Sequence, residues 1–150
     1  MKNGSKIMSL IDGSKKMSKS DPNEGSRINL LDTPEIITKK IKRAKSDSYI
    51  GIEFNNPERA ESKNLLMIYS ILSGKDISQC ENEFSETGWG TFKKLIAEQL
   101  IESLTPIQEK YKVLINDPHQ LNNILQDGRE KAEDLANKTL KRVKSKLGFI

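Results

Sequence analysis

From residue 32 to the carboxyl end, apolar side chains recur three or four residues apart, and no other feature of the sequence limits the fold as strongly. The spacing is most regular in residues 91–115, where steps of four and three alternate at Leu100, Leu104, Ile107, Tyr111 and Leu114. Side chains spaced in this way lie on one face of an α-helix. A capping residue followed by proline and an acid, at residues 32–35 and again at 56–58, is typical of a helix start. We therefore predict helices at about residues 34–44, 57–73, 76–84, 91–115, 118–126 and 128–146, packed as a bundle.

The first 31 residues follow a different pattern. Residues 7–11 have the composition of a short strand, residues 12–26 form a loop rich in lysine, serine, glycine and aspartate, and residues 27–31 are a second extended segment. A single strand is not stable without a sheet to join. The sequence therefore predicts a mainly α protein, in which a helical bundle at 32–150 follows a strand and a mobile loop, at 1–31, from the end of a larger α/β domain.

The composition fits a folded protein in a reducing compartment. Hydrophobic residues make up 35% and charged residues 31%, and the net charge of +4 is compatible with a polyanionic partner without requiring one. The single cysteine, Cys80, cannot form a disulfide within the chain, and we expect it to be buried by packing. The longest apolar run, residues 65–69, is too short to cross a bilayer, and the amino end has no signal-peptide pattern. We expect a cytoplasmic protein with no membrane partner.

One short motif carries chemistry, the run Lys16-Met17-Ser18-Lys19-Ser20 in the loop. Lysine ammonium groups, serine hydroxyls and loop N–H groups all donate hydrogen bonds to phosphate oxygens. Taken alone, the motif is also compatible with an ordinary solvated loop.

The residues around the motif resemble the carboxy-terminal half of bacterial tryptophanyl-tRNA synthetases, which are class I aminoacyl-tRNA synthetases. The resemblance includes the motif, which is similar to the second signature of that class, and extends along the chain through residues 7–10, 12–13, 15–23, 26–30, 64–74, 89–94, 106–111 and 138–143. Tyrosyl-tRNA synthetases, the nearest relatives, usually carry a different residue set in and after this loop.

The resemblance implies a function for each part of the chain. The family joins tryptophan to tRNA(Trp) in an ATP-dependent reaction, with Mg²⁺ accompanying ATP. The resemblance implies catalytic roles for Lys16 and Lys19 and no protein ligands for a metal. It also implies that the nucleotide is bound by Ile7, Lys16, Met17, Ser18, Lys19 and Ser20. Residues 1–31 would be the end of a Rossmann-type catalytic domain and residues 32–150 a helical tRNA anticodon-binding domain. Family members are homodimers, but the resemblance implies that their dimer contacts lie largely in the other half of the enzyme, so the oligomeric state of this chain is left open.

Two clusters of basic residues are candidate RNA contacts, although each could equally be a solvated helix face. One comprises Lys39, Lys40, Lys42, Arg43 and Lys45, and the other comprises Lys138, Lys141, Arg142, Lys144 and Lys146. Trp89 and Phe92 could stack on a base, but we expect them to anchor the long helix instead. The only histidine, His119, is expected at the surface.

The family's first signature, the Rossmann units and a tryptophan pocket have no counterpart in these 150 residues. We therefore expect the chain alone to be inactive. An alternative is a stand-alone, catalytically dead RNA-binding or regulatory module that descends from the enzyme, and another is a helical protein-interaction domain with no RNA partner.

Overall fold

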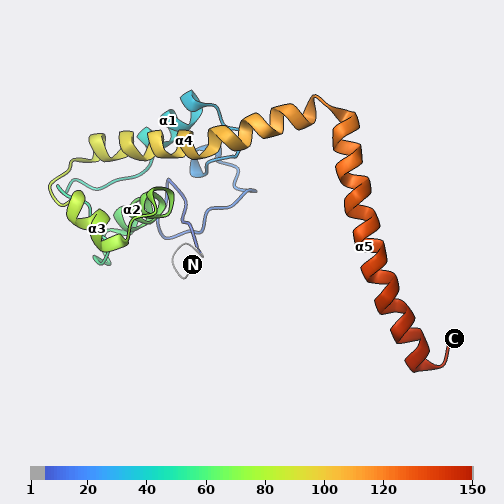
Figure 1. The fold of residues 1–150 in the computed structure, drawn as a ribbon. Helices are drawn as coiled ribbons and strands as arrows, with labels where there is room; N and C mark the ends of the chain where they lie inside the picture. The colour runs from blue at the N-terminus through green and yellow to red at the C-terminus, as the bar shows by residue number, and fades with distance from the viewer. Residues whose placement is uncertain (1–5, 150) are drawn as a thin grey trace. The chain divides into compact units, whose positions relative to one another are not determined.

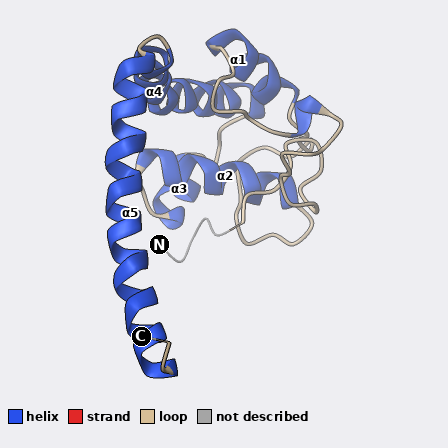
Figure 2. Ribbon diagram, turned by 90° about the vertical axis from the view of Figure 1, so that its right-hand side faces the viewer, coloured by secondary structure: helices blue, strands red, loops and turns tan. Residues whose placement is uncertain are grey.

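The computed structural model describes residues 6–149, and their regular structure is helical (Figures 1 and 2). Within this range there are five α-helices, preceded by one short 3-10 helix, and no β-strand. The elements are η1 (Glu24–Ser26), α1 (Pro34–Arg43), α2 (Ala60–Ser73), α3 (Ile77–Glu83), α4 (Trp89–Ile115) and α5 (Pro118–Leu147). The prediction of a mainly helical protein is confirmed.

Local signals explain where most of the helices begin and end. The Thr33 side chain accepts a hydrogen bond from the Ile36 N–H, and Pro34 occupies the first turn of α1, where its missing N–H costs little. Gly74 ends α2 in the left-handed conformation, with φ +70°. The start of α2 lies later than predicted, because the Asn56 side chain accepts from the Glu58 N–H and forms a turn before the helix.

Two predictions are wrong in detail. No strand forms at residues 7–11: Met8 makes a single antiparallel bridge with Lys16, and the pairing ends because the Leu10 N–H donates to the Ser26 carbonyl instead. The two predicted helices at 118–126 and 128–146 are one helix, α5, which runs through Gly128. A helical glycine costs roughly 1 kcal/mol, too little to end a helix that ion pairs such as Lys131–Asp127 support across this point.

The described chain divides into two compact units, Met1–Gln108 and Glu109–Ile150. The first contains the hydrophobic core, to which α1, α2, α3 and the first part of α4 all contribute. At its centre the rings of Tyr69, Phe84 and Phe92 pack together, with centroids 4.7–5.9 Å apart. Cys80 is fully buried beside them, as predicted. Most of the second unit is α5, which has no buried residue.

None of the helices in residues 6–149 is both long and apolar enough to cross a membrane. The domain boundary expected between residues 31 and 32 stays a prediction. In the structure, residues on both sides of it belong to the first compact unit.

Candidate functional site

The loop that carries the motif, residues 16–20 (hereafter the signature loop), presents its polar side chains to solvent. Lys16, Ser18, Lys19 and Ser20 are exposed, whereas Met17 is half-buried. The Ser18 and Ser20 hydroxyls lie 3.2 Å apart, and the Ser18 hydroxyl also accepts a hydrogen bond from the Ser20 N–H. The loop therefore offers two ammonium groups and two hydroxyls on one short stretch of backbone.

The half-buried members of the predicted nucleotide site are brought together at the base of this loop. The Met17 N–H donates to the Ile7 carbonyl at 2.9 Å, and both side chains pack against the hydrophobic core. Lys16 and Lys19 remain exposed beyond this point. The arrangement anchors the apolar residues of the motif and leaves its cations accessible.

The base of the loop is also tied to α2 by one buried side chain, Asn64. Its amide oxygen accepts from the Met8 N–H at 2.8 Å, and its amide nitrogen donates to the Met8 carbonyl at 2.9 Å. Asn64 is 4% exposed and thus satisfies both backbone groups of Met8, as a neighbouring strand would. This contact explains how an extended segment is held here without a sheet.

Gly13 lies between Met8 and the signature loop, and it allows this part of the chain a second close approach to α2. A Cβ at this position would lie 2.9 Å from the Ala60 carbonyl carbon and 3.0 Å from the Glu61 nitrogen. Because both neighbours are backbone atoms, a larger residue would push the segment away from α2. Nearby, the Lys45 ammonium forms an ion pair with Glu61 at 2.8 Å, and the backbone N–H of Lys45 donates to the Leu10 carbonyl.

Short polar contacts shape the segment before and after the signature loop. Hydrogen bonds from the Ser14 side chain, and then from Lys15, lower the pKa of Asp12 to about 2, so this carboxylate is charged near neutral pH. After the loop, the Arg27 guanidinium donates to the Asp21 carbonyl at 2.7 Å and to the Asn29 side chain at 3.1 Å. These contacts order both ends of the loop without involving Lys16 or Lys19.

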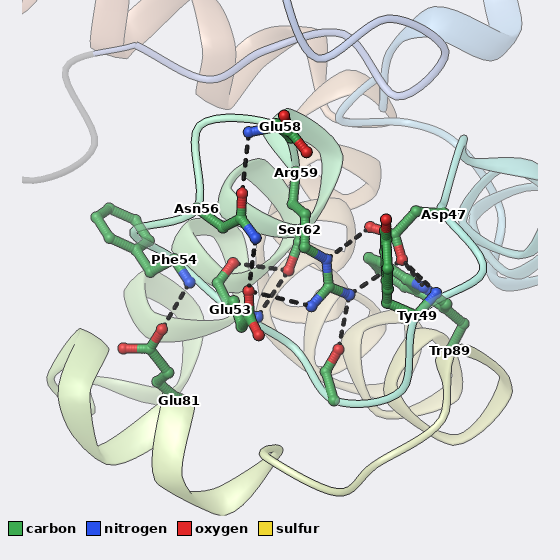
Figure 3. Close-up of polar contacts among 11 residues, drawn as sticks. Asp47, Tyr49, Glu53, Phe54, Asn56, Glu58, Arg59, Ser62, Glu81 and Trp89 are labelled. Carbon is green, nitrogen blue, oxygen red and sulfur yellow. Dashed lines mark hydrogen bonds and ion pairs between the residues drawn. The ribbon is translucent and has the colours of Figure 1, made fainter.

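A second polar cluster centres on Arg59, just before α2 (Figure 3). Its guanidinium binds both carboxylate oxygens of Asp47, at 2.8 and 3.0 Å, and donates to the Gly51 carbonyl at 2.8 Å. Glu53 lies 3.5 Å away, and the Tyr49 ring centroid lies 5.4 Å from the guanidinium carbon. The Arg59 side chain is only 2% exposed, so its charge is paired inside the protein.

The cluster fixes the segment between α1 and α2, residues 45–59, hereafter the bracing segment. The Ser62 hydroxyl donates to the Glu53 carbonyl and accepts from the Glu53 N–H, while Glu81 on α3 accepts from the Phe54 N–H. Gly51 has φ +79°, and a Cβ there would lie 2.1 Å from the Ser85 carbonyl oxygen. Only glycine fits this position without moving the backbone.

The same cluster reaches the start of α4 through Asp47. The Trp89 indole N–H donates to Asp47 at 3.0 Å. Burial alone would raise the pKa of Asp47, but hydrogen bonds from Arg59, Trp89 and the Tyr49 backbone outweigh burial and lower it. Asp47 is therefore a carboxylate shared between Arg59 and Trp89.

Trp89 and Phe92, which the sequence linked as possible base-stacking residues or anchors, have different environments. Phe92 is fully buried and confirms the prediction of an anchor. Trp89 is half-buried and lines a pocket of about 480 Å³ between α1 and α4. His119 is exposed, as predicted.

The two basic clusters also differ from what the sequence suggested. In the first, Lys40 pairs with Asp32 at 2.6 Å and Lys45 with Glu61, while Lys39, Lys42 and Arg43 are exposed on α1. In the second, all five members are exposed on α5, but Lys138 pairs with Asp134 at 2.6 Å, whereas Lys141, Arg142, Lys144 and Lys146 form no ion pair within the described residues. Each cluster therefore presents fewer cations to a partner than its sequence predicts.

The sequence reasoning did not identify Asn64, Arg59 or Asp47. Asn64 carried a weak signal, because a polar residue directly before the apolar run 65–69 of α2 needs partners for its amide if the helix buries that side. Arg59 and Asp47 lie in irregular segments, where no periodicity indicates burial. Their pairing over twelve residues is visible only in the structure.

Comparison with known proteins places these features in a family. Residues 3–105 match the family "tRNA synthetases class I (W and Y)". A tryptophan–tRNA ligase of Prochlorococcus marinus subsp. pastoris (strain CCMP1986 / NIES-2087 / MED4) is 79% identical over 149 residues, covering 99% of this chain and 44% of the relative. The chloroplastic/mitochondrial tryptophan–tRNA ligase of Arabidopsis thaliana is 48% identical over 146 residues, covering 97% of this chain and 36% of the relative.

A solved structure supports the same relationship. The crystal structure of tryptophanyl-tRNA synthetase from Mycoplasma pneumoniae superposes with a TM-score of 0.79 at 29% identity, covering 99% of this chain and 45% of that one. The chain thus spans less than half the length of the relatives it matches. Because the family match covers more than half of its 150 residues, this chain belongs to the class I tRNA synthetases of the W and Y type.

Proposed function

We propose that this chain supplies the signature loop and the tRNA-binding helices of a tryptophan–tRNA ligase. The reaction would convert tryptophan, ATP and tRNA(Trp) to tryptophanyl-tRNA, AMP and pyrophosphate in the cytoplasm. One observation carries the proposal: the signature loop exposes Lys16, Lys19 and two hydroxyls while its base is fixed to the core and to Asn64. The similarity to tryptophan–tRNA ligases supports the choice of amino acid.

In the first step, a carboxylate oxygen of tryptophan would attack the α-phosphorus of ATP, and the bond to the bridging oxygen would break to release pyrophosphate. Negative charge then grows on the leaving group. Lysine suits this step, because an ammonium on a long, flexible stem can follow phosphate oxygens as they separate. We assign this role to Lys19 and Lys16, with Ser18 and Ser20 as hydroxyl donors to the phosphates.

Met17 and the backbone near Ile7 would lie beside the adenine. The Met17 side chain is half-buried against the core, and an apolar surface of this kind suits one face of a purine. Mg²⁺ would arrive with ATP, bound to its phosphates. Residues 1–31 would then form the end of the catalytic domain and residues 32–150 the helical domain that receives the tRNA anticodon.

The parts that bind tryptophan and hold the first signature would come from the remaining length that the relatives have. We therefore expect the chain alone to give no tryptophan-dependent exchange of pyrophosphate into ATP. A chimera in which this chain replaces the matching 44% of the Prochlorococcus relative should be active, since 79% of the residues are identical. We expect the chimera to be a homodimer, as the family resemblance implies.

In the chimera, Lys19→Ala should lower the rate of exchange far more than it weakens ATP binding. Loss of one preorganised donor costs about 3–4 kcal/mol of transition-state stabilisation, or roughly 10²–10³-fold in rate. Lys15→Ala is the matched control, because Lys15 is an exposed lysine of the same loop region that pairs with Asp12. It should exchange at nearly the parent rate.

Equal losses in rate and ATP affinity would show that Lys19 only binds nucleotide. An inactive chimera that still binds tRNA would instead support a catalytically dead RNA-binding module.

A further inference from the structure

The pocket between α1 and the first part of α4 has an apolar lining with positive charge around it. Its apolar surface comes from Trp89, Ala97 and Ile101, and Gly90 leaves room at the start of α4. The volume of about 480 Å³ lies within the range of roughly 300–1,000 Å³ that small-molecule sites usually occupy. All of its lining residues belong to the first compact unit.

The polar atom of Trp89 is already satisfied inside the protein. Its indole N–H donates to Asp47, and Asp47 in turn accepts from two nitrogens of the Arg59 guanidinium, Nε and Nη2 (Figure 3). What Trp89 adds to the pocket lining is therefore apolar ring surface, in an orientation set by a buried ion pair. The bracing segment thus positions an aromatic ring at the pocket.

The three lysines at the pocket have different roles. The Lys93 ammonium donates to the Ala44 carbonyl at 2.6 Å and to the Ser46 hydroxyl at 3.0 Å, and it lies 5.7 Å from the Trp89 ring centroid. It therefore supports the end of α1, and burial lowers its pKa. Lys42 and Lys94 are exposed, but Lys94 lies 3.9 Å from Glu98, an acid that also lines the pocket. Three lysines and one glutamate leave the lining with a net positive charge, and Lys42 is the cation that a ligand would meet most directly.

We propose that this pocket binds an unpaired nucleobase of an RNA strand, with the base against Trp89 and the adjoining phosphates beside Lys42 and Lys94. A fixed aromatic ring in a pocket with exposed lysines suits single-stranded RNA, since bases stack on aromatic faces and phosphates pair with cations. A purely apolar partner would gain nothing from the lysines. The proposal rests on the proposed tRNA-binding function and gives it a defined position on the helical surface.

The chain contains a single tryptophan, so the pocket carries its own probe. We expect an unstructured oligoribonucleotide of adenine and cytosine to change Trp89 fluorescence in a saturable way. The midpoint should equal that from fluorescence anisotropy of the same oligonucleotide carrying a dye. Stacking of one base is worth about 1–3 kcal/mol, so filling the pocket should weaken binding by roughly 5- to 150-fold.

Gly90→Leu is the variant that fills the pocket, and Gly88→Leu is its matched control. A Cβ at either position meets nothing within 4 Å, and neither glycine has positive φ, so neither leucine should clash with the fold. Both variants should unfold cooperatively in urea, within about 1 kcal/mol of the parent, since leucine favours the helix at Gly90 and caps it less well at Gly88. Of the two glycines, Gly90 lines the pocket and Gly88 does not. Gly90→Leu should lose affinity and the fluorescence change, whereas Gly88→Leu should keep both within twofold.

The outcomes separate this proposal from the proposed function. RNA that binds equally well to the parent and to Gly90→Leu, with unchanged Trp89 emission, overturns the base pocket and leaves tRNA binding elsewhere on the chain intact. Failure to bind any RNA, tRNA included, overturns the RNA-binding function and the pocket together. A fluorescence change with an apolar peptide and none with RNA would assign the pocket to a protein contact and also overturn the proposal.

Discussion

The signature loop and the bracing segment are both irregular and rich in charge, yet they use charge in opposite ways. The signature loop exposes Lys16 and Lys19 to solvent. The bracing segment holds Arg59 at 2% exposure and pairs it with Asp47, which is 18% exposed. Buried charges are costly unless they are paired, whereas exposed ones remain available to a ligand. Position in the fold, more than residue type, therefore separates a supporting charge from one that can act on a substrate.

The largest expected effect comes from breaking the buried ion pair of the bracing segment. Arg59→Leu removes one partner of a buried pair and leaves Asp47 uncompensated, so the free energy of unfolding should fall by about 3–5 kcal/mol. Arg59→Lys keeps the charge without the two-pronged geometry and should lose less. Urea denaturation of the isolated chain measures both values.

Lys19→Ala provides the other side of that experiment. As an exposed residue it should change the free energy of unfolding by no more than about 0.5 kcal/mol. If Arg59→Leu and Lys19→Ala destabilised the chain equally, the distinction between supporting and exposed charge would be wrong.

A smaller effect is expected at Asn64, which joins the base of the signature loop to α2. Asn64→Leu removes both hydrogen bonds to Met8 without creating a large cavity, and buried backbone groups left unpaired cost about 1–3 kcal/mol. Amide exchange at Met8 should accelerate together with that at Met17, since the two segments are paired.

Asn64→Asp is the matched control for this contact. It keeps the acceptor for the Met8 N–H but places a buried carboxylate oxygen against the Met8 carbonyl, so near neutral pH it should destabilise the chain at least as much as Asn64→Leu. At low pH, where the carboxyl can be protonated and donate to the Met8 carbonyl, its loss should be smaller. Unchanged exchange at Met8 in Asn64→Leu would mean that Asn64 does not hold the base of the signature loop.

A pH titration of stability tests the pair of Asp47 and Arg59 by protonating Asp47 gradually. The folded state holds the pKa of Asp47 below its ordinary value of 3.8, so the unfolded chain takes up a proton first as the pH falls. The contribution of Asp47 to stability is therefore complete above about pH 4 and is lost as the pH falls through the lower, folded-state pKa.

Asp47→Asn provides the reference for that titration. The difference in unfolding free energy between the parent and Asp47→Asn should narrow as the pH falls from neutrality towards 3 and below. A difference that stays constant would show that the pairing of Asp47 is not linked to its protonation. The total change should be smaller than that of Arg59→Leu, because a protonated carboxyl still accepts hydrogen bonds.

The helices were largely predictable from the sequence because their signals are local. Thr33 and Pro34 begin α1, and Gly74 ends α2 as predicted, since caps depend on neighbouring residues only. Gly128 misled the prediction, because the cost of one glycine is small beside the ion pairs and hydrogen bonds that span it. The strand predicted at residues 7–11 does not form because the partners of this segment come from separate parts of the chain. The Leu10 N–H donates to the Ser26 carbonyl, and the Asn64 side chain, 56 residues away, bonds Met8.

The candidate site divides in the same way. The signature loop is continuous in sequence, so its residues could be named from the motif, and their chemical roles stay predictions. The support around it depends on Asn64, and the orientation of Trp89 depends on Asp47 and Arg59. Asn64 and Trp89 lie on α2 and α4, and Asp47 and Arg59 are twelve residues apart in the bracing segment, so no local pattern places these residues together.

The smallest expected effect in free energy concerns the exposed charge on α5. If Lys141 and Arg142 contact RNA phosphates, replacing both with alanine should reduce the slope of log K against log salt for tRNA binding by about one to two units, since each contact contributes about 0.7–0.9. The loss should be similar for every tRNA tested, because phosphate contacts carry no sequence information. The matched control is Arg129→Ala with Lys131→Ala. The double substitution removes the same two positive charges from the same exposed helix, but Arg129 and Lys131 are engaged with Glu133 and Asp127. We expect no direct phosphate contact from them, and the slope should hardly change. Equal slopes for the parent and both double variants would show that α5 is a solvated face, and would move the expected phosphate contacts to Lys39, Lys42 and Arg43 on α1.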